Sequence, residues 1–478
     1  MRRVLVTAFI MAALSAPAAA QDAKSVLASA SKAMGADTLK TVEYSGSGFD
    51  FAIGQAPNPN LPWPKFIDKT YTRQINFETP ASKMDRIRMQ GENPPHGGGQ
   101  QPVIGEQPQN QTIIVAANTP WVQQLEIWMM PQGFLRAAAA RNATAASQSV
   151  GGKKMTVVTF MGENKAKVNG YINDQNLVEK VETWIDNAVL GDMLFEAVYS
   201  DYKDFGGVKF PTKIVQRQGG HPILDLTIND VKPNAAVTIQ PPQGRGGAPG
   251  GAPPAAAAAG TPTEKLAEGV YLILGGYASV AVDFKDGIVV IEGPQSDQRA
   301  EQIITEAKRL IPNKPIKYVV NTHHHWDHLG GIRTYVHEGA TVITHEANRP
   351  YYQEVLRARP WVLEPDRFSL NPPEEWSEGY IFETVREKFI LGDDTRTIEL
   401  HSVAGLAHAL GMLVVYIPKE KIVVQADLYN PQATALNASN RTFYQNLQRL
   451  KLDVATIVGI HGNPGPMAPF VQLMSKAQ

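Results

Sequence analysis

The 478-residue sequence contains no cysteine. Disulfide bonds, thiolate metal ligands and thiol nucleophiles are therefore excluded within these residues. The sequence also lacks a surplus of either charge, with 45 lysines and arginines against 46 aspartates and glutamates. We expect no nucleic-acid partner, because binding to a polyanion requires a basic surplus. Any metal site in this chain must be built from nitrogen and oxygen ligands.

Long apolar runs are scarce, and the one near the N-terminus has a special context. Arg2 and Arg3 precede an apolar stretch, Val4–Leu14, and the small residues Ala18–Ala20 follow it. This order of charged, apolar and small residues is typical of a secretory signal peptide, which we predict at residues 1–20. A membrane-spanning helix needs about 20 apolar residues, and no later stretch supplies them. We expect a periplasmic or secreted protein without stable membrane insertion.

Residues 21–239 are predicted to form a β-rich N-terminal domain. After a short helix at Ser25–Met34, runs of β-branched and aromatic residues recur up to Val237, separated by turn signals such as Gly206-Gly207. A helical segment is expected at Leu125–Ala140. The pattern indicates a mostly antiparallel β domain.

Residues 240–262 are predicted to be a linker between two domains. They are rich in glycine, proline and alanine and lack the large apolar side chains that a core requires. Beyond them, over residues 263–478, short strands alternate with helices, as in the helix Gln298–Leu310 followed by the strand Ile316–Val320. This alternation predicts an α/β layered domain with a site at its strand ends.

The stretch Asn321–Gly331, directly after that strand, reads Asn-Thr-His-His-His-Trp-Asp-His-Leu-Gly-Gly. Residues two apart in extended chain project to the same side, so His323 and His325 can reach one cation. Asp327 and His328, where the chain turns, are free to face a second cation. The alternative is a histidine-rich surface loop, which the number and type of these side chains disfavour.

Two cations need more ligands than one loop provides, and three later loops each supply one. His408 lies between glycines in a turn before an apolar strand. Asp427 follows the strand Ile422–Gln425, and His461 follows the strand Thr456–Ile460. A carboxylate in the position of Asp427 can lie between two cations.

This ordered set resembles the metallo-β-lactamase-fold hydrolases. The likeness consists of His-X-His-X-Asp-His, a Gly-X-X-His-X-X-Gly turn, an aspartate at a strand end and a final strand followed by His-Gly, and it covers about residues 263–478. It implies an αββα sandwich with two zinc ions at one edge of the sheets. It also implies that one zinc is held by His323, His325 and His408, the other by Asp327, His328 and His461, and that Asp427 bridges them.

The ligand set indicates metal-assisted hydrolysis. Zinc lowers the pKa of a bound water to about 7, and a pair of ions about 3.5 to 4 Å apart can also polarise the substrate and stabilise its leaving group. Asp327, besides binding metal, would orient the nucleophile and pass on its proton. We predict that metal-bound hydroxide cleaves an ester, lactone or thioester-type bond in a small molecule, hydrophobic compounds included. Iron or manganese would suit the same nitrogen and oxygen ligands.

Two departures from the family pattern bear on the subclass. The β-lactamases of this superfamily usually carry cysteine or serine where this chain has Asp427, and the aspartate is more similar to the thioesterase, lactonase and phosphodiesterase branches. Hydrolysis of β-lactams is therefore the second hypothesis. Many relatives also have an Asp-X-Gly turn after an early strand, where this chain has Glu292-Gly293-Pro294.

A hypothesis of another class is a non-catalytic periplasmic protein that binds a lipid or another hydrophobic ligand. The N-terminal domain faintly resembles the curved half-barrel sheets of periplasmic lipoprotein carriers, whose concave face receives acyl chains. That resemblance rests on strand content and a short leading helix. Bound metal and hydrolysis of a substrate panel would distinguish the two classes.

Overall fold

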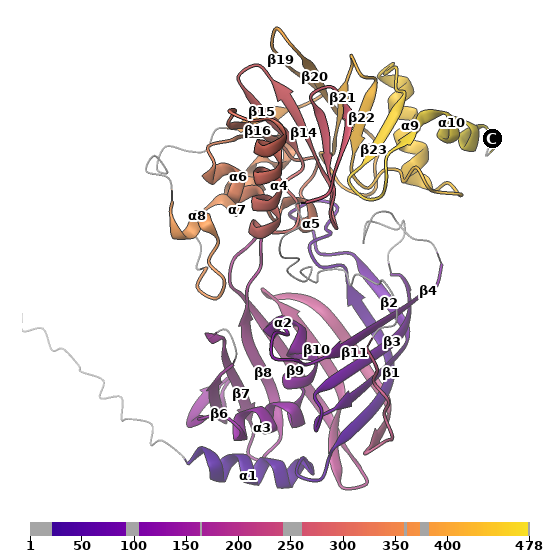
Figure 1. Cartoon of the computed structure of the whole chain (residues 1–478). Helices are drawn as coiled ribbons and strands as arrows, with labels where there is room; N and C mark the ends of the chain where they lie inside the picture. The colour runs from indigo at the N-terminus through magenta and orange to yellow at the C-terminus, as the bar shows by residue number, and fades with distance from the viewer. Residues whose placement is uncertain are drawn as a thin grey trace, which may run out of the picture.

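The computed structural model describes residues 22–91, 105–162, 165–241, 261–357, 361–372 and 382–476. The expected signal peptide lies outside the described residues, as does most of the expected linker. Figure 1 shows an N-terminal β-rich region and a C-terminal layered domain joined end to end. Within the described residues, no helix is long and apolar enough to cross a membrane.

The N-terminal region is built on one antiparallel sheet, in the order β4-β3-β2-β1-β11-β10-β9-β8-β7-β6-β5. Its strands are β1 (Thr41–Phe51), β2 (Lys65–Asn76), β3 (Ala81–Gln90), β4 (Gln107–Ile114), β5 (Thr144–Val150), β6 (Lys153–Met161), β7 (Lys167–Ile172), β8 (Val178–Ile185), β9 (Met193–Phe205), β10 (Val208–Gln218) and β11 (His221–Pro233). The predicted mostly antiparallel fold is confirmed. The sequence pattern missed β5, whose residues are mainly small or polar, and β7, a short strand in which Asn169 and Gly170 interrupt the β-branched and aromatic residues.

Three helices pack against this sheet: α1 (Ala23–Met34), α2 (Trp121–Trp128) and α3 (Pro131–Ala139). The side chain of Asp22 caps the start of α1 by accepting hydrogen bonds from two backbone amides, and Gly35 ends the helix in a left-handed conformation. The predicted single helical segment is two helices, because Pro131 starts a new helix after Met129 and Met130.

The C-terminal domain contains two facing sheets. The first has the order β12-β13-β14-β15-β16-β17-β18 and the second β19-β20-β21-β22-β23-β24. The strands of the first are β12 (Thr263–Ala267), β13 (Val270–Ile273), β14 (Ser279–Phe284), β15 (Gly287–Ile291), β16 (Ile316–Val320), β17 (Thr341–His345) and β18 (Phe382–Val385). Those of the second are β19 (Lys388–Gly392), β20 (Thr397–Ser402), β21 (Leu413–Ile417), β22 (Ile422–Gln425), β23 (Thr456–Gly459) and β24 (Gly465–Pro466).

Helices cover the outer faces of both sheets (Figure 1). Those on the first sheet share a buried core with β13, β15, β16 and β17. They are α4 (Asp297–Leu310), α6 (Ile332–His337), α7 (Arg349–Leu356) and α8 (Arg367–Leu370), with α5 (Trp326–Leu329) and the short 3₁₀ helix η2 (Glu346–Asn348) in the connecting loops. On the second sheet lie α9 (Ala438–Arg449) and α10 (Met467–Ser475). The αββα sandwich expected from the sequence is therefore confirmed.

The loops that carry the candidate site meet where the two sheets approach each other. β16 is parallel to β15 and β17, and β22 is parallel to β23, so their carboxyl ends share an edge. Backbone hydrogen bonds join the sheets there, from Ala278 N to Ile460 O and from Leu413 N to Thr322 O. The loops after β16, β22 and β23 are thereby brought together.

Candidate metal centre

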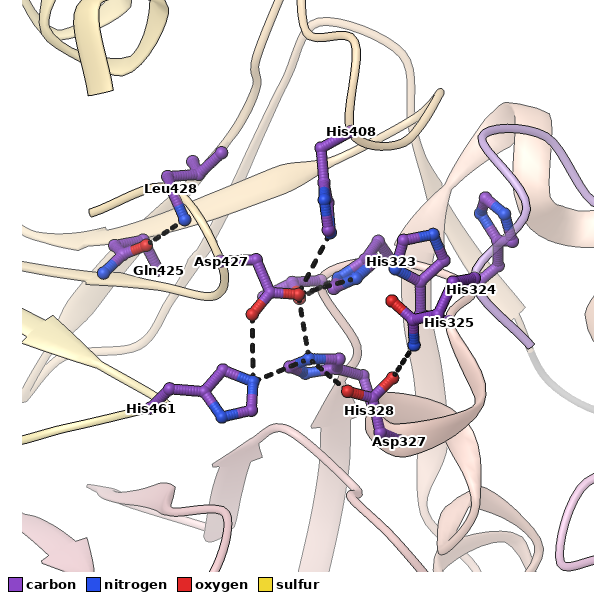
Figure 2. Close-up of polar contacts among 12 residues, drawn as sticks. His323, His324, His325, Asp327, His328, His408, Gln425, Asp427, Leu428 and His461 are labelled. Carbon is purple, nitrogen blue, oxygen red and sulfur yellow. Dashed lines mark hydrogen bonds and ion pairs between the residues drawn. The ribbon is translucent and has the colours of Figure 1, made fainter. Parts of the chain in front are cut away.

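Seven side chains of metal-ligand type converge at this edge (Figure 2). They come from four loops, and within each of two groups one ligand atom per residue lies within 4.8 Å of the others. The first group is His323, His325, His408 and Asp427, and the second is Asp327, His328 and His461. The structure thus brings together every residue that the sequence singled out as a ligand, while metal binding itself stays a prediction.

The carboxylate of Asp427 lies between the two groups. Its Oδ2 is 3.0 Å from His408 Nε2 and 3.1 Å from His328 Nε2, and its Oδ1 is 2.9 Å from His461 Nε2. The residue has a φ of 60°, in the left-handed region that aspartate adopts more readily than most residues other than glycine, at the turn after β22. Burial raises the pKa of Asp427, but the charges of His328 and His461 outweigh this and hold its pKa well below the usual value. The ionised carboxylate is the form that binds cations.

The imidazoles of the first group are buried and turn nitrogen atoms toward the space that an ion would occupy. His323, His325 and His408 are fully buried, and burial lowers the pKa of His323 and His325 well below the usual value. His325 Nε2 donates to the backbone carbonyl of Ala56 at 3.0 Å, so its Nδ1 carries the lone pair. That Nδ1 is buried without a hydrogen-bond partner, whereas His323 Nε2 lies 3.3 Å from Asp427 Oδ2. Buried polar atoms are normally paired, and a cation would satisfy His325 Nδ1.

The second group has spacings that suit a shared ion. His328 Nε2 and His461 Nε2 are 3.1 Å apart, and Asp327 Oδ2 is 3.6 Å from His328 Nε2. Donors at the usual Zn–N and Zn–O lengths in a tetrahedron lie about 3.3 Å from one another. The donor atoms of the second group therefore fit zinc in type and spacing, and those of the first group fit it in type.

Glu292 supports the second group and was not identified as a site residue from the sequence. Its side chain is fully buried, and it accepts a hydrogen bond from His328 Nδ1 at 2.9 Å and from Thr322 N at 2.7 Å. Burial lowers the pKa of His328, but the charges of Asp427, Asp327 and Glu292 outweigh it and raise that pKa well above the usual value. Although this chain has Glu292-Gly293-Pro294 in place of the Asp-X-Gly turn, it thus still has a carboxylate that accepts a hydrogen bond from an expected ligand histidine.

Tyr277 is a second residue that the sequence did not reveal. It lies in the turn between β13 and β14, its hydroxyl donates to Asp327 Oδ2 at 3.1 Å, and its ring centroid is 4.3 Å from that of His461. Burial, followed by the charge of Asp327, raises its pKa, so the phenol keeps its proton. A lone tyrosine after two glycines carries no motif that could have identified it.

The other histidines of the C-terminal domain that the structure describes belong to neither group. His324 is buried and its Nε2 donates to the carbonyl of Ala56 at 2.8 Å, so it has a structural contact. His345 Nδ1 accepts from Ala347 N, and His401 contacts Glu399 at 2.8 Å.

The C-terminal domain is similar in sequence to a known protein family. Residues 274–461 match the model of the metallo-beta-lactamase superfamily. Similar solved structures include a metallo-beta-lactamase from Pontibacter korlensis, with 20% identity and a TM-score of 0.35, covering 45% of this chain and 97% of that one. Another, from Hirschia baltica, has 15% identity and a TM-score of 0.34 and covers 45% and 96%. The FIM-1 enzyme from Pseudomonas aeruginosa in its mono-zinc form has 18% identity and a TM-score of 0.33, with 45% and 95% covered. No curated protein gives a significant match.

Proposed function

Because residues 274–461 belong to the metallo-beta-lactamase superfamily, we propose that the protein is an exported dinuclear zinc hydrolase. Its substrate is a small molecule with an ester, lactone or thioester-type bond. The observation that carries the proposal is the convergence of seven ligand-type side chains from four loops, with the Asp427 carboxylate between the two groups. An aspartate there suits this subclass better than the cysteine or serine usual in β-lactamases.

The seven side chains would form two metal-binding sites. His323, His325 and His408 would hold one, Asp327, His328 and His461 the other, and Asp427 would set their separation. When bound, zinc supplies Lewis acidity and lowers the pKa of water to about 7.

Asp327 is placed to handle the proton of the reaction. Its Oδ1 accepts a hydrogen bond from Gln55 Nε2 at 2.7 Å, and its Oδ2 accepts one from the Tyr277 hydroxyl at 3.1 Å. These two donors hold the carboxylate in one orientation, from which it would accept a proton from the attacking water and pass it to the leaving group.

The substrate is expected to approach from the side of Asp327. This side chain is 26% exposed and that of His461 is 11% exposed, whereas the three histidines of the first group are fully buried. Tyr277, which contacts both part-exposed residues, would meet the substrate on that side.

The test combines elemental analysis with a panel of chromogenic esters, lactones, thioesters, phosphodiesters and a cephalosporin. We expect two equivalents of zinc per chain and hydrolysis within the ester, lactone and thioester group. Asp427→Ala should abolish both metal retention and hydrolysis. Asp453→Ala, which removes a surface carboxylate paired with Lys421, should keep both.

Two outcomes would contradict the proposal. A metal-free protein that is inert on the panel but retains lipid through purification would favour the ligand-binding alternative. Preferred hydrolysis of the cephalosporin would indicate a β-lactam hydrolase. Export is tested separately, by sequencing the N-terminus of the protein recovered from the periplasm or medium.

A further inference from the structure

The loop between β1 and β2 of the N-terminal region reaches the metal centre of the C-terminal domain. Figure 1 shows it rising from the sheet toward α5. Its residues 54–57, here called the insertion segment, make hydrogen bonds to the His-X-His-X-Asp loop and to the turn after His408. The backbone bonds run from Trp326 N to Gly54 O and from Leu410 N to Pro57 O.

Two further bonds act directly on expected ligands. The carbonyl of Ala56 accepts the Nε2 hydrogens of both His324 and His325, at 2.8 and 3.0 Å. A carbonyl can only accept, so this contact selects the His325 tautomer whose Nδ1 is free for a cation. The amide of Gln55 donates to Asp327 Oδ1 at 2.7 Å, which fixes the rotation of that carboxylate.

A glycine and two tryptophans hold the insertion segment against the loop that carries the ligands. Gly54 has a φ of 73°, and a Cβ added there would lie 2.5 Å from the ring of Trp326, so only glycine fits. The ring of Trp326 packs edge-on against that of Trp63, with centroids 5.3 Å apart. Trp326 stands between the ligands His325 and Asp327, so the loop that carries the ligands is itself anchored in the N-terminal region.

We propose that the N-terminal region completes the metal centre, with Ala56 and Gln55 acting as positioning residues for His325 and Asp327. The inference rests on the proposed dinuclear hydrolase and adds that its ions bind at full affinity only while the insertion segment is in place. Partners that orient ligands in this way typically contribute ten- to hundredfold in metal affinity.

The first test uses a matched pair of glycine substitutions in the full chain. Gly54→Ala places a methyl group against Trp326, whereas Gly206→Ala has a similar φ of 66° and meets nothing within 4 Å. Zinc affinity is measured by competition with a chromogenic chelator, and the visible spectrum of the cobalt-substituted protein reports ligand geometry. We expect Gly54→Ala to weaken binding about tenfold or more and to alter the cobalt spectrum, with no change in Gly206→Ala.

A second pair removes side chains alone, in case Gly54→Ala does not fold. Gln55→Ala deletes the donor to Asp327, and Gln74→Ala deletes a donor to the Glu43 carboxylate at the same distance of 2.7 Å. Gln55→Ala should weaken binding of the second zinc equivalent and lower kcat more than it raises KM, while Gln74→Ala should do neither.

The outcomes separate this inference from the proposed function. A wild-type protein that binds no zinc would overturn both. Two tightly bound ions in the wild type, with unchanged affinity in Gly54→Ala and Gln55→Ala, would overturn the inference alone. Unchanged affinity with faster hydrolysis in these variants would show that the insertion segment covers the centre instead of positioning its ligands.

Discussion

Replacing Glu292 by glutamine tests how the second group of ligands is supported. The buried Glu292 carboxylate accepts hydrogen bonds from His328 Nδ1 and from the backbone of Thr322. Glutamine keeps the length and one acceptor oxygen, which can face His328 Nδ1, but it removes the negative charge and turns an NH2 group toward the backbone N–H of Thr322. His328 would still be oriented, but its ring would be less basic toward a cation.

The expected loss of zinc affinity follows from the energy of the hydrogen bond between His328 Nδ1 and the Glu292 carboxylate. Hydrogen bonds to charged groups contribute about 1.5–3 kcal/mol and neutral ones about 0.5–1.5 kcal/mol. The difference of about 1–1.5 kcal/mol corresponds to about tenfold in affinity. We therefore expect Glu292→Gln to bind the zinc of Asp327, His328 and His461 about tenfold more weakly, with a much smaller change at the other group.

The assay is zinc competition against a chelator, with the two equivalents resolved by titration. Glu420→Gln is the matched control, because Glu420 is also a largely buried carboxylate, paired with Arg396 Nη1 at 2.6 Å. Glu420 precedes β22, whereas Asp427 follows that strand, so the two residues lie at opposite ends of it. Glu420→Gln should therefore lower the stability of the protein without weakening its binding of zinc. Equal affinities in Glu292→Gln and wild type, or equal losses in the two variants, would refute the reasoning.

Three further predictions concern other parts of the molecule. His408→Ala should retain one zinc equivalent and lose nearly all hydrolysis, and elemental analysis that still finds two equivalents would contradict this. Tyr277→Phe should keep both ions but lower kcat about tenfold, because a hydrogen bond to the Asp327 carboxylate is lost; unchanged steady-state kinetics would exclude a role for the hydroxyl. Burial, followed by the charge of Asp50, raises the pKa of Asp68 to about 6, so its ionisation costs stability as the pH rises from about 4 through 6. Asp68→Asn should therefore be more stable than wild type at pH 8 by up to about 3 kcal/mol and lose this advantage near pH 4. Urea unfolding of both proteins at the two pH values measures this. An equal difference in unfolding free energy at both pH values would contradict the prediction.

The sequence alone determined the class of the C-terminal domain and the residues that meet in its candidate site. Ligand spacing within His323–His328 is local, and His408, Asp427 and His461 stand beside apolar strands whose ends can be read from the chain. The meeting of His323–His328 with the other three residues, however, was implied only by the family resemblance, because β16 and β22–β23 lie in different sheets. The weak strands β5 and β7 lacked such a local signal.

Only the tertiary structure decided which side chains surround those ligands. Glu292 supports His328 because β15 and β16 are parallel neighbours, and Tyr277 reaches Asp327 because a turn of the first sheet lies against the end of β23. The contact of Ala56 with His325 joins residues 269 positions apart and depends on how two separate regions pack. Backbone carbonyls carry no sequence identity, so no residue pattern could have revealed that contact.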